Sequence, residues 1–280
     1  MIPMQTHSGA ISLLAQVQAS RVSPGRWAAR IPRDWWAWAG PHGGLLAAVG
    51  LNATLDVVSE QASALVPRAV SVRFHGRCGD GPLDVRAKAE RVSASSTIVA
   101  TEVRQDGEVV VSSVTTLTAP RPGLSLQNTQ GPVAAPPEDC EVFQLPADLV
   151  PFGRQVEIRP AGGALPLTGS DLAEMRAWLR LRTALPVDPT VAVVLADALA
   201  PGIFPRLIAP AAVPTVELTV HFHGNLRSAP VDDWVLAVQR NVSCDDGWCV
   251  DETELWSRGG KLLAQARQLR RLLGAPALAA

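Results

Sequence analysis

Apolar and polar residues alternate along two long stretches of the chain, residues 83–117 and 234–269. A period of two is typical of antiparallel strands with one buried face, and each stretch has room for three such strands. Asp106-Gly107 and Gly259-Gly260 lie where the last hairpin of each stretch must reverse, because primed turns need a positive φ. The pattern therefore predicts two similar three-stranded units.

Each three-stranded unit is preceded by an apolar stretch of helical length. Residues 44–58 and 190–200 are apolar almost all round, which predicts two buried helices rather than surface helices. A Trp-bearing extended piece lies upstream of each helix, beginning at Gly25 and at Glu174, and fits a first strand. The order of strand, buried helix and antiparallel strands thus occurs twice.

A short motif repeats in the strand that should follow each helix. VRFHG ends at Gly76 and VHFHG ends at Gly224, while residues 119–140 are rich in Pro, Gly, Ser and Gln and read as a linker. We predict an α+β fold of two tandem hotdog domains, residues 1–118 and 141–280. Each is a long antiparallel sheet wrapped around one buried helix, and the two sheets join. The alternative, two unrelated α+β domains with a chance echo, leaves the shared element order unexplained.

Composition and charge exclude several classes of protein. The chain has 280 residues, of which 47% are hydrophobic and 18% charged, so it can bury a sizeable core. Its net charge of -1 gives no general attraction to nucleic acid or to an anionic membrane. The N-terminus lacks a signal-peptide pattern, and no apolar run approaches the roughly 20 residues of a membrane span. We therefore expect a cytoplasmic protein.

The common nucleotide-binding and hydrolase motifs are absent from the sequence, including Gly-x-Gly-x-x-Gly, the Walker loop, Gly-x-Ser-x-Gly and His-Glu-x-x-His. The cysteines form no Cys-x-x-Cys pair, and no set of ligands at zinc spacing accompanies them. We expect neither a metal nor a cofactor. The four cysteines are expected to be free thiols: Cys78, Cys140, Cys244 and Cys249.

A lone carboxylate, Asp197, lies among the apolar residues of the second predicted helix. An ionised carboxylate there must be paired, hydrogen-bonded or functional, and a backbone cap or an arginine partner is the structural alternative. In the strand that follows, alternation places Thr215 on a polar face together with Glu217. The last strand carries Gln265 and Gln268 on opposite faces, so only one of them can point toward the same site.

These residues resemble the acyl-CoA thioesterase II family, the double-hotdog members of the thioesterase-like superfamily, over residues 25–273 apart from the linker. The aligning features are LADALAP around Asp197, the Phe-His pair that begins seven residues after Thr215, and LLAQARQL around Gln268. The resemblance implies that Asp197, Thr215 and Gln268 hold the water that attacks an acyl-CoA thioester. It also implies an acyl-CoA substrate and a homo-oligomer.

The chain departs from the family directly after Gln268. The family usually continues Gln-Glu-Gly, whereas Leu269 and Arg270 follow here, so Gln265 remains a rival for Gln268. Arginine forks match phosphate geometry, so the basic residues near the C-terminus could meet the phosphates of CoA, although a solvated strand end explains them equally well. These residues are Arg267, Arg270 and Arg271.

The start of the first predicted helix offers a place for the substrate. His42, Gly43 and Gly44 would bring backbone N–H groups at a positive helix end to the developing oxyanion, and glycine lets a thioester approach closely. The alternative is a tight turn into the helix. In the first half Pro67 falls where Thr215 falls in the second, and Thr116 falls near the place of Gln268. We therefore predict one functional site.

Two other functions stay open on the sequence alone. A hotdog hydratase or dehydratase acting on acyl-CoA or an acyl-carrier protein needs a catalytic histidine, and His42, His221 and His223 are the candidates. A non-catalytic acyl-binding module could keep the same fold without the reaction.

Overall fold

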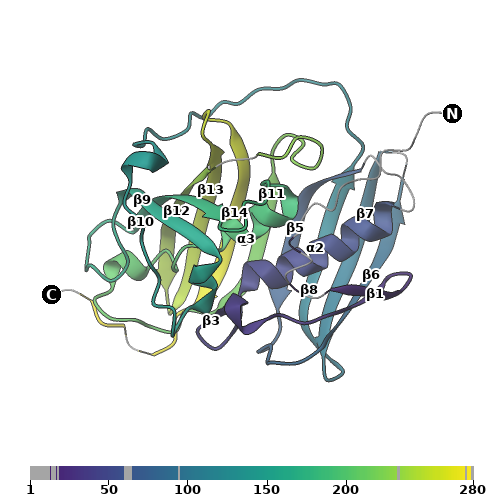
Figure 1. Ribbon diagram of the computed structural model, residues 1–280, viewed down its shortest axis with the longest axis horizontal. Helices are drawn as coiled ribbons and strands as arrows, with labels where there is room; N and C mark the ends of the chain where they lie inside the picture. The colour runs from purple at the N-terminus through teal and green to yellow at the C-terminus, as the bar shows by residue number, and fades with distance from the viewer. Residues whose placement is uncertain are drawn as a thin grey trace.

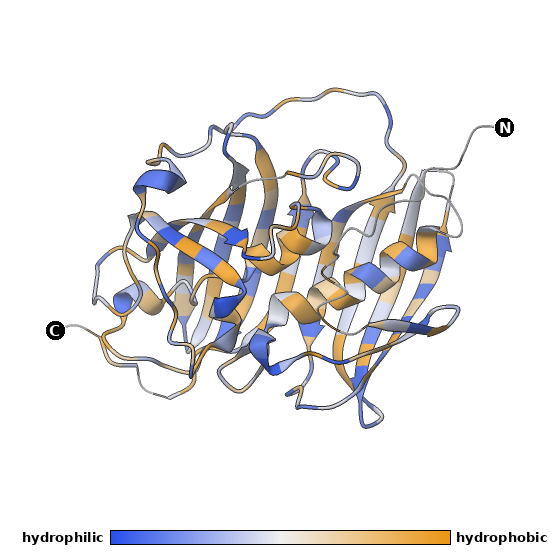
Figure 2. Cartoon of the chain, viewed as in Figure 1, coloured by the Kyte–Doolittle hydropathy of each residue, from blue (hydrophilic) through white to orange (hydrophobic). Residues whose placement is uncertain are grey.

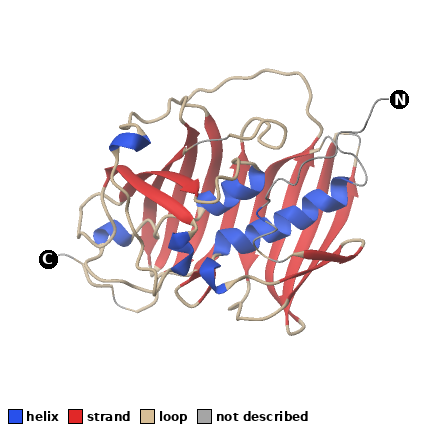
Figure 3. Ribbon diagram, viewed as in Figure 1, coloured by secondary structure: helices blue, strands red, loops and turns tan. Residues whose placement is uncertain are grey.

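A computed structural model describes residues 13, 17, 19–59, 65–93, 95–231, 234–274 and 276–278. One antiparallel sheet of twelve strands runs through the molecule, and its concave face wraps around two helices (Figures 1 and 3). The helices lie side by side on this face, where they pack against each other. This is the long sheet wrapped around a buried helix, twice over, that the sequence predicts.

The first half contributes six strands of the large sheet and the longer helix. Its elements are β1 (Ser20–Ser23), β2 (Arg26–Ala29), α2 (Gly43–Ser59), β5 (Val66–Phe74), β6 (Leu83–Val92), β7 (Ser96–Gln105) and β8 (Glu108–Thr118). A small separate hairpin precedes the helix, formed by β3 (Trp36–Ala37) and β4 (Gly40–Pro41).

The second half repeats this order. Its elements are β9 (Val156–Gly163), β10 (Glu174–Leu181), α3 (Pro189–Ala196), β11 (Thr215–Phe222), β12 (Val235–Asp245), β13 (Trp248–Ser257) and β14 (Leu262–Arg271). Residues 119–136 form neither helix nor strand. The three-stranded units and both hairpin turns are confirmed, whereas the outermost strands β1 and β9 were not expected from the sequence.

The strand order shows that the two halves are duplicates. It runs β1-β2-β6-β7-β8-β5-β11-β14-β13-β12-β10-β9, so each half mirrors the other across the antiparallel pair β5–β11. Irregularities match as well: the register shifts between Pro67 and Ala69 in one half and between Thr215 and Glu217 in the other. These matched positions allow residues of the two halves to be compared one by one.

Capping residues set where the helices begin. Asp188 caps α3, because its Oδ1 accepts the backbone N–H groups of Thr190 (2.8 Å) and Val191 (2.9 Å), and Pro189 occupies the first helical position. Apolar residues cover most of α3 and alternate along the strands beneath it (Figure 2). Burial of this apolar surface holds the helix on the sheet.

Helix α3 is shorter than the sequence suggests. It ends at Ala196 rather than at Ala200, and Asp197 follows the helix instead of lying within it. The backbone N–H of Asp197 donates to Val194 O at 3.2 Å, a tight last turn that directs the chain away from the helix axis before Pro201. The prediction of a carboxylate inside the helix is therefore wrong by one residue, and Asp197 is the C-cap.

The expectation of four free thiols is wrong for two of them. Cys244 and Cys249 form a disulfide between β12 and β13, where they stand directly opposite each other. The spacing of the two cysteines does not by itself predict a disulfide, because the register of the β12–β13 hairpin brings their side chains together. Cys78 and Cys140 are free.

Candidate active site

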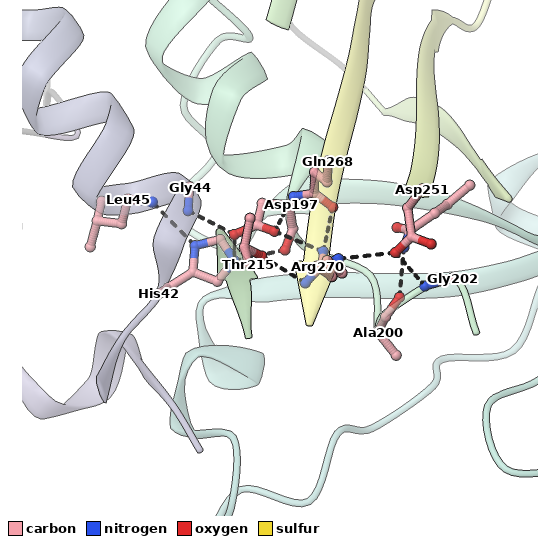
Figure 4. A network of polar contacts seen from close by, with 11 residues as sticks. His42, Gly44, Leu45, Asp197, Ala200, Gly202, Thr215, Asp251, Gln268 and Arg270 are labelled. Atoms are coloured by element: carbon pink, nitrogen blue, oxygen red, sulfur yellow. Dashed lines mark hydrogen bonds and ion pairs between the residues drawn. The ribbon is translucent and has the colours of Figure 1, made fainter. Parts of the chain in front are cut away.

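The carboxylate of Asp197 lies where the end of α3 meets the beginning of α2. Its Oδ2 accepts the backbone N–H of Gly44 at 2.8 Å, and the side chain is 8% exposed (Figure 4). A carboxylate at a helix C-terminus faces the negative end of the helix dipole, but the positive end of α2 is directed at it from the other side. The first half therefore supplies part of the environment of this second-half residue.

Two glycines make this close approach possible. A Cβ on Gly44 would lie 2.9 Å from Val193 O and 3.0 Å from Asp197 Cβ, and a Cβ on Gly43 would lie 3.0 Å from Asp197 Oδ2. Real Cβ atoms keep larger distances from such atoms. Glycine at both positions therefore allows the amino end of α2 to rest against the carboxylate.

His42 connects the same two elements. Its Nδ1 accepts the backbone N–H of Leu45 at 3.2 Å, and its Nε2 lies 2.9 Å from the carbonyl oxygen of Asp197. A carbonyl oxygen only accepts, so Nε2 carries the ring proton and donates it, while Nδ1 caps α2. Both ring nitrogens are thus occupied, and the ring packs at a tilt against Phe152 with 4.3 Å between the ring centroids, so His42 orients the site.

Of the two candidate glutamines, Gln268 is the one that lies at Asp197. Its Nε2 donates to Asp197 Oδ1 at 2.5 Å from β14. Gln265 points to the opposite face, where it is hydrogen-bonded to His223 (3.0 Å) and Glu254 (3.3 Å).

Thr215 also faces the site, for a reason that strict alternation misses. The register shift in β11 pairs Thr215 with Arg270, while Leu218 of the apolar set pairs with Gln268. Thr215 and Leu218 therefore lie on the same face as Gln268 and Arg270. The bulge turns Thr215 to the concave face, so its expected place beside Glu217 on the polar face is wrong. Its Oγ1 accepts a hydrogen bond from Arg270 Nη1 at 2.8 Å.

Arg270 links the three predicted site residues. It is 6% exposed, and Nη2 donates to Asp197 Oδ1 at 3.1 Å and makes a short hydrogen bond to Gln268 Oε1 (Figure 4). On its other side, Nε lies 2.9 Å from Asp251 Oδ2. Arg270 is therefore neither a solvated strand end nor a residue placed to meet CoA phosphates, because its whole fork is directed inward.

Asp251 was missed at the level of sequence. It is 1% exposed, its Oδ2 accepts the N–H of Gly202 at 2.9 Å, and its Oδ1 accepts Asn241 Nδ2 at 2.8 Å. Alternation could have found it, since Asp251 takes an inward position of β13. Side-chain contacts link Asn241, Asp251, Arg270 and Thr215 into a polar row that crosses β12, β13, β14 and β11 diagonally.

The duplicate half builds the same row from mostly apolar residues. Register equates Arg270 with Leu117, Asp251 with Val99 and Asn241 with Ala89, and Pro67 takes the place of Thr215. Thr115, rather than Thr116, is the counterpart of Gln268. Burying charges is costly, and the first half folds without them. The charged row is therefore an addition to what the fold requires.

No group of three or more His, Cys, Asp or Glu side chains suited to a metal occurs among the described residues. No helix in the same part of the chain is long and apolar enough to cross a membrane.

Two hotdog units that share one sheet and hold a buried carboxylate between them define a double-hotdog enzyme. The model of the acyl-CoA thioesterase N-terminal domain matches residues 32–118, and that of the C-terminal domain matches residues 137–271. The chain belongs to the acyl-CoA thioesterase family and is a thioester hydrolase. No curated protein matches it.

Solved structures share the fold along nearly the whole chain. A hotdog-fold protein of unknown function from Alicyclobacillus acidocaldarius is 24% identical, with a TM-score of 0.86, and the match covers 95% of this chain and 100% of that one. An acyl-CoA thioesterase II from Mycobacterium marinum is 18% identical, with a TM-score of 0.72 and coverage of 92% and 96%. A 12:0-ACP thioesterase from Umbellularia californica is 12% identical, with a TM-score of 0.52 and coverage of 88% and 93%.

Proposed function

We propose that this enzyme hydrolyses acyl-CoA thioesters to a free acid and CoA, with Asp197 as the group that holds and deprotonates water. The observation that carries the proposal is the carboxylate of Asp197, buried at the junction of two helix ends and fixed by donors from both halves. A buried carboxylate with defined partners is a candidate general base. Thr215 and Gln268 complete the water-binding group.

The acceptor capacity of the carboxylate suggests where the water binds. Each carboxylate oxygen accepts about two hydrogen bonds. Asp197 Oδ1 receives Gln268 and Arg270, whereas Oδ2 receives Gly44 from among the described residues. We therefore assign the water to the second acceptor position of Oδ2. There the carboxylate can take a proton as the water oxygen attacks.

The proposed reaction needs no covalent intermediate. The water oxygen bonds to the thioester carbon, its proton passes to Asp197, and the carbonyl oxygen becomes an oxyanion. The C–S bond then breaks as the carbonyl re-forms, and the proton moves from Asp197 to the sulfur of CoA. Positioning and general-base catalysis each supply large rate factors in such a step.

The oxyanion is proposed to form at the amino end of α2. The positive end of α2 is directed at this position, and His42, whose Nδ1 accepts the N–H of Leu45, keeps that end in place. Thr215 adds a second donor, because its oxygen accepts from Arg270 and its hydroxyl proton remains for the substrate or the water.

The acyl chain is proposed to enter an apolar hollow beside the site. Leu199 and Ala200, just after Asp197, line this hollow together with Met175 of β10 and Ile158 of β9. Apart from Arg176, which forms an ion pair with Glu174, the lining is apolar and suits a hydrocarbon chain.

The positions of the histidines favour hydrolysis over hydration. A hydratase needs a histidine free to exchange a proton with the substrate. Both ring nitrogens of His42 are engaged, and His223 bonds Gln265 on the opposite face of β14 from Gln268. His221 pairs with Gln265 in register and is exposed on that same face.

The proposal is tested by thiol release from acyl-CoAs of graded chain length. We expect wild-type turnover, and a fall in kcat of about 10²- to 10⁴-fold in Asp197→Asn, the range typical of a lost general base. Asp188→Asn is the matched control, because Asp188 caps the other end of α3 and Asn caps a helix equally well. Wild-type inactivity on every chain length, or equal activity of Asp197→Asn and Asp188→Asn, would refute the proposal.

A further inference from the structure

We propose that Arg270 is a positioning residue that fixes the hydrogen-bond directions of Gln268 and Thr215, and that Asp251 holds Arg270 in place. This inference rests on the proposed function, since it assigns a role within the same site. It concerns a buried arginine at a position that the duplicate half fills with Leu117.

Arg270 determines which way the amide of Gln268 faces. A guanidinium only donates hydrogen bonds, and an ionised carboxylate only accepts them. Gln268 lies between the two, so its Oε1 must face Arg270 and its Nε2 must face Asp197. Asp197 alone already excludes the reversed amide, but without the guanidinium Gln268 Oε1 loses its donor, and the side chain is no longer held against the carboxylate.

Arg270 determines the direction of the Thr215 hydroxyl in the same way. Its Nη1 donates to Thr215 Oγ1 at 2.8 Å, so the hydroxyl proton is directed elsewhere. One guanidinium thus leaves Gln268 donating to the carboxylate and Thr215 available as a donor. Both are the directions that the proposed water and oxyanion require.

Asp251 keeps the guanidinium in this orientation. Its Oδ2 lies 2.9 Å from Arg270 Nε and also accepts the N–H of Gly202. A Cβ on Gly202 would lie only 2.6 Å from Asp251 Oδ1, so the chain after α3 packs directly on this carboxylate. Arg270 is therefore held between two buried carboxylates, Asp197 and Asp251.

The duplicate half suggests a variant that removes Asp251 together with Arg270, so that of the two buried carboxylates only Asp197 remains, with the Gly44 N–H and Gln268 Nε2 as donors. Leu117 and Val99 occupy the places of Arg270 and Asp251 and are buried in an otherwise equivalent sheet. Replacing both members of a buried ion pair by apolar residues is often neutral for stability, whereas removing one is strongly destabilising. The double variant Arg270→Leu with Asp251→Val should therefore fold.

The experiment compares kcat, KM and Tm of the wild type, the double variant and Arg271→Leu. Arg271 is half-buried at the end of β14, where its Nη1 donates to the carbonyl oxygen of Asp246. We expect kcat of the folded double variant to fall about 30- to 100-fold, as small misplacements of catalytic groups do, with KM within about threefold. Arg271→Leu should keep both values. A folded double variant with kcat within about twofold of wild type would overturn the proposal.

Arg270→Lys keeps the inference testable if the double variant does not fold. A single ammonium keeps the charge but cannot reproduce the planar fork that joins Thr215 and Gln268. We expect a fall in kcat at nearly constant KM, and unchanged kcat would contradict the proposal.

A crystallographic readout separates this inference from the proposed function. The electron density of the Gln268 amide should show a single position against Asp197 in the wild type and a displaced amide or several positions in the Arg270 variants. An unchanged amide would overturn the positioning role even if the wild type hydrolysed no acyl-CoA. Wild-type inactivity with the expected change in the amide would count against the proposed function alone.

Discussion

A methyl group at Gly44 would disturb the contact between the two halves on which the site depends. In Gly44→Ala the new Cβ would meet His42 Cε1 and Val193 O at 2.9 Å and Asp197 Cβ at 3.0 Å. Two of these contacts are with atoms of α3 and its cap, so the amino end of α2 must move away. The hydrogen bond from the Gly44 N–H to Asp197 Oδ2 would lengthen as a result.

Gly50 of the same helix provides the matched control. A Cβ there would lie 3.4 Å from Ser113 Oγ and 3.5 Å from Thr101 Cγ2, which are ordinary contacts. Gly50→Ala should therefore stabilise the protein by about 0.5–1 kcal/mol, because alanine loses less backbone entropy in a helix.

Gly44→Ala should have the opposite effect. Overpacking costs about 1–3 kcal/mol, and weakening a hydrogen bond to a charged group costs about 1.5–3 kcal/mol, partly offset by the helix propensity of alanine. A net loss of about 2–4 kcal/mol corresponds to a fall in Tm of about 5–15 °C for a protein of this size. The displacement of Asp197 from its water should lower kcat about 100-fold.

Thermal unfolding and thiol release from an acyl-CoA measure both effects. The reasoning requires Gly44→Ala to lose stability and activity while Gly50→Ala keeps its activity and gains stability. If the two variants behaved alike, the contact between α2 and Asp197 would not matter for either property.

Two further predictions concern other titrating groups. Burial raises the pKa of the Cys78 thiol to about 11, so at pH 8 about one molecule in a thousand carries the reactive thiolate at Cys78. Alkylation of the native protein followed by peptide mapping should therefore label Cys140 first and Cys78 only on unfolding. Equal labelling of the two cysteines would contradict this. Burial pushes the pKa of Glu157 upward, but hydrogen bonds from Arg180 and Arg159 outweigh it and leave the pKa below its usual value. The stabilisation from the Glu157 carboxylate is present above its usual pKa and is lost as pH falls through its lowered pKa. Glu157→Gln should therefore be less stable than wild type by about 1 kcal/mol at pH 7, and the difference should close between about pH 5 and pH 3 in paired melting curves. A difference in stability that is constant with pH would refute this prediction.

Much of the fold could be predicted because it rests on local patterns. Period-two alternation predicted the strands β6 to β8 and β12 to β14, and two continuous apolar stretches predicted the helices α2 and α3. The repeated Phe-His-Gly motif marked β5 and β11, which pair at the centre of the sheet. These signals depend on which side chains face the core, and that information is carried by neighbouring residues.

The parts that could not be predicted depend on register and on pairing between distant strands. A bulge moved Thr215 to the concave face, and hairpin register joined Cys244 to Cys249. Arg270 looks like one of several basic residues at a strand end, because its burial follows only from Asp251 on the next strand. The sequence nevertheless carried a signal, since Gln268 and Arg270 are two residues apart and must share a face.

The central claim is that water held by Asp197 attacks the thioester directly. A single turnover in water enriched in heavy oxygen, with enzyme in excess over acyl-CoA and analysis by mass spectrometry, tests it most directly. The account predicts one heavy oxygen in the acid released by the first turnover and none in the peptide that contains Asp197. An unlabelled acid together with a labelled Asp197 peptide would contradict it, because the carboxylate would then have acted as a covalent nucleophile.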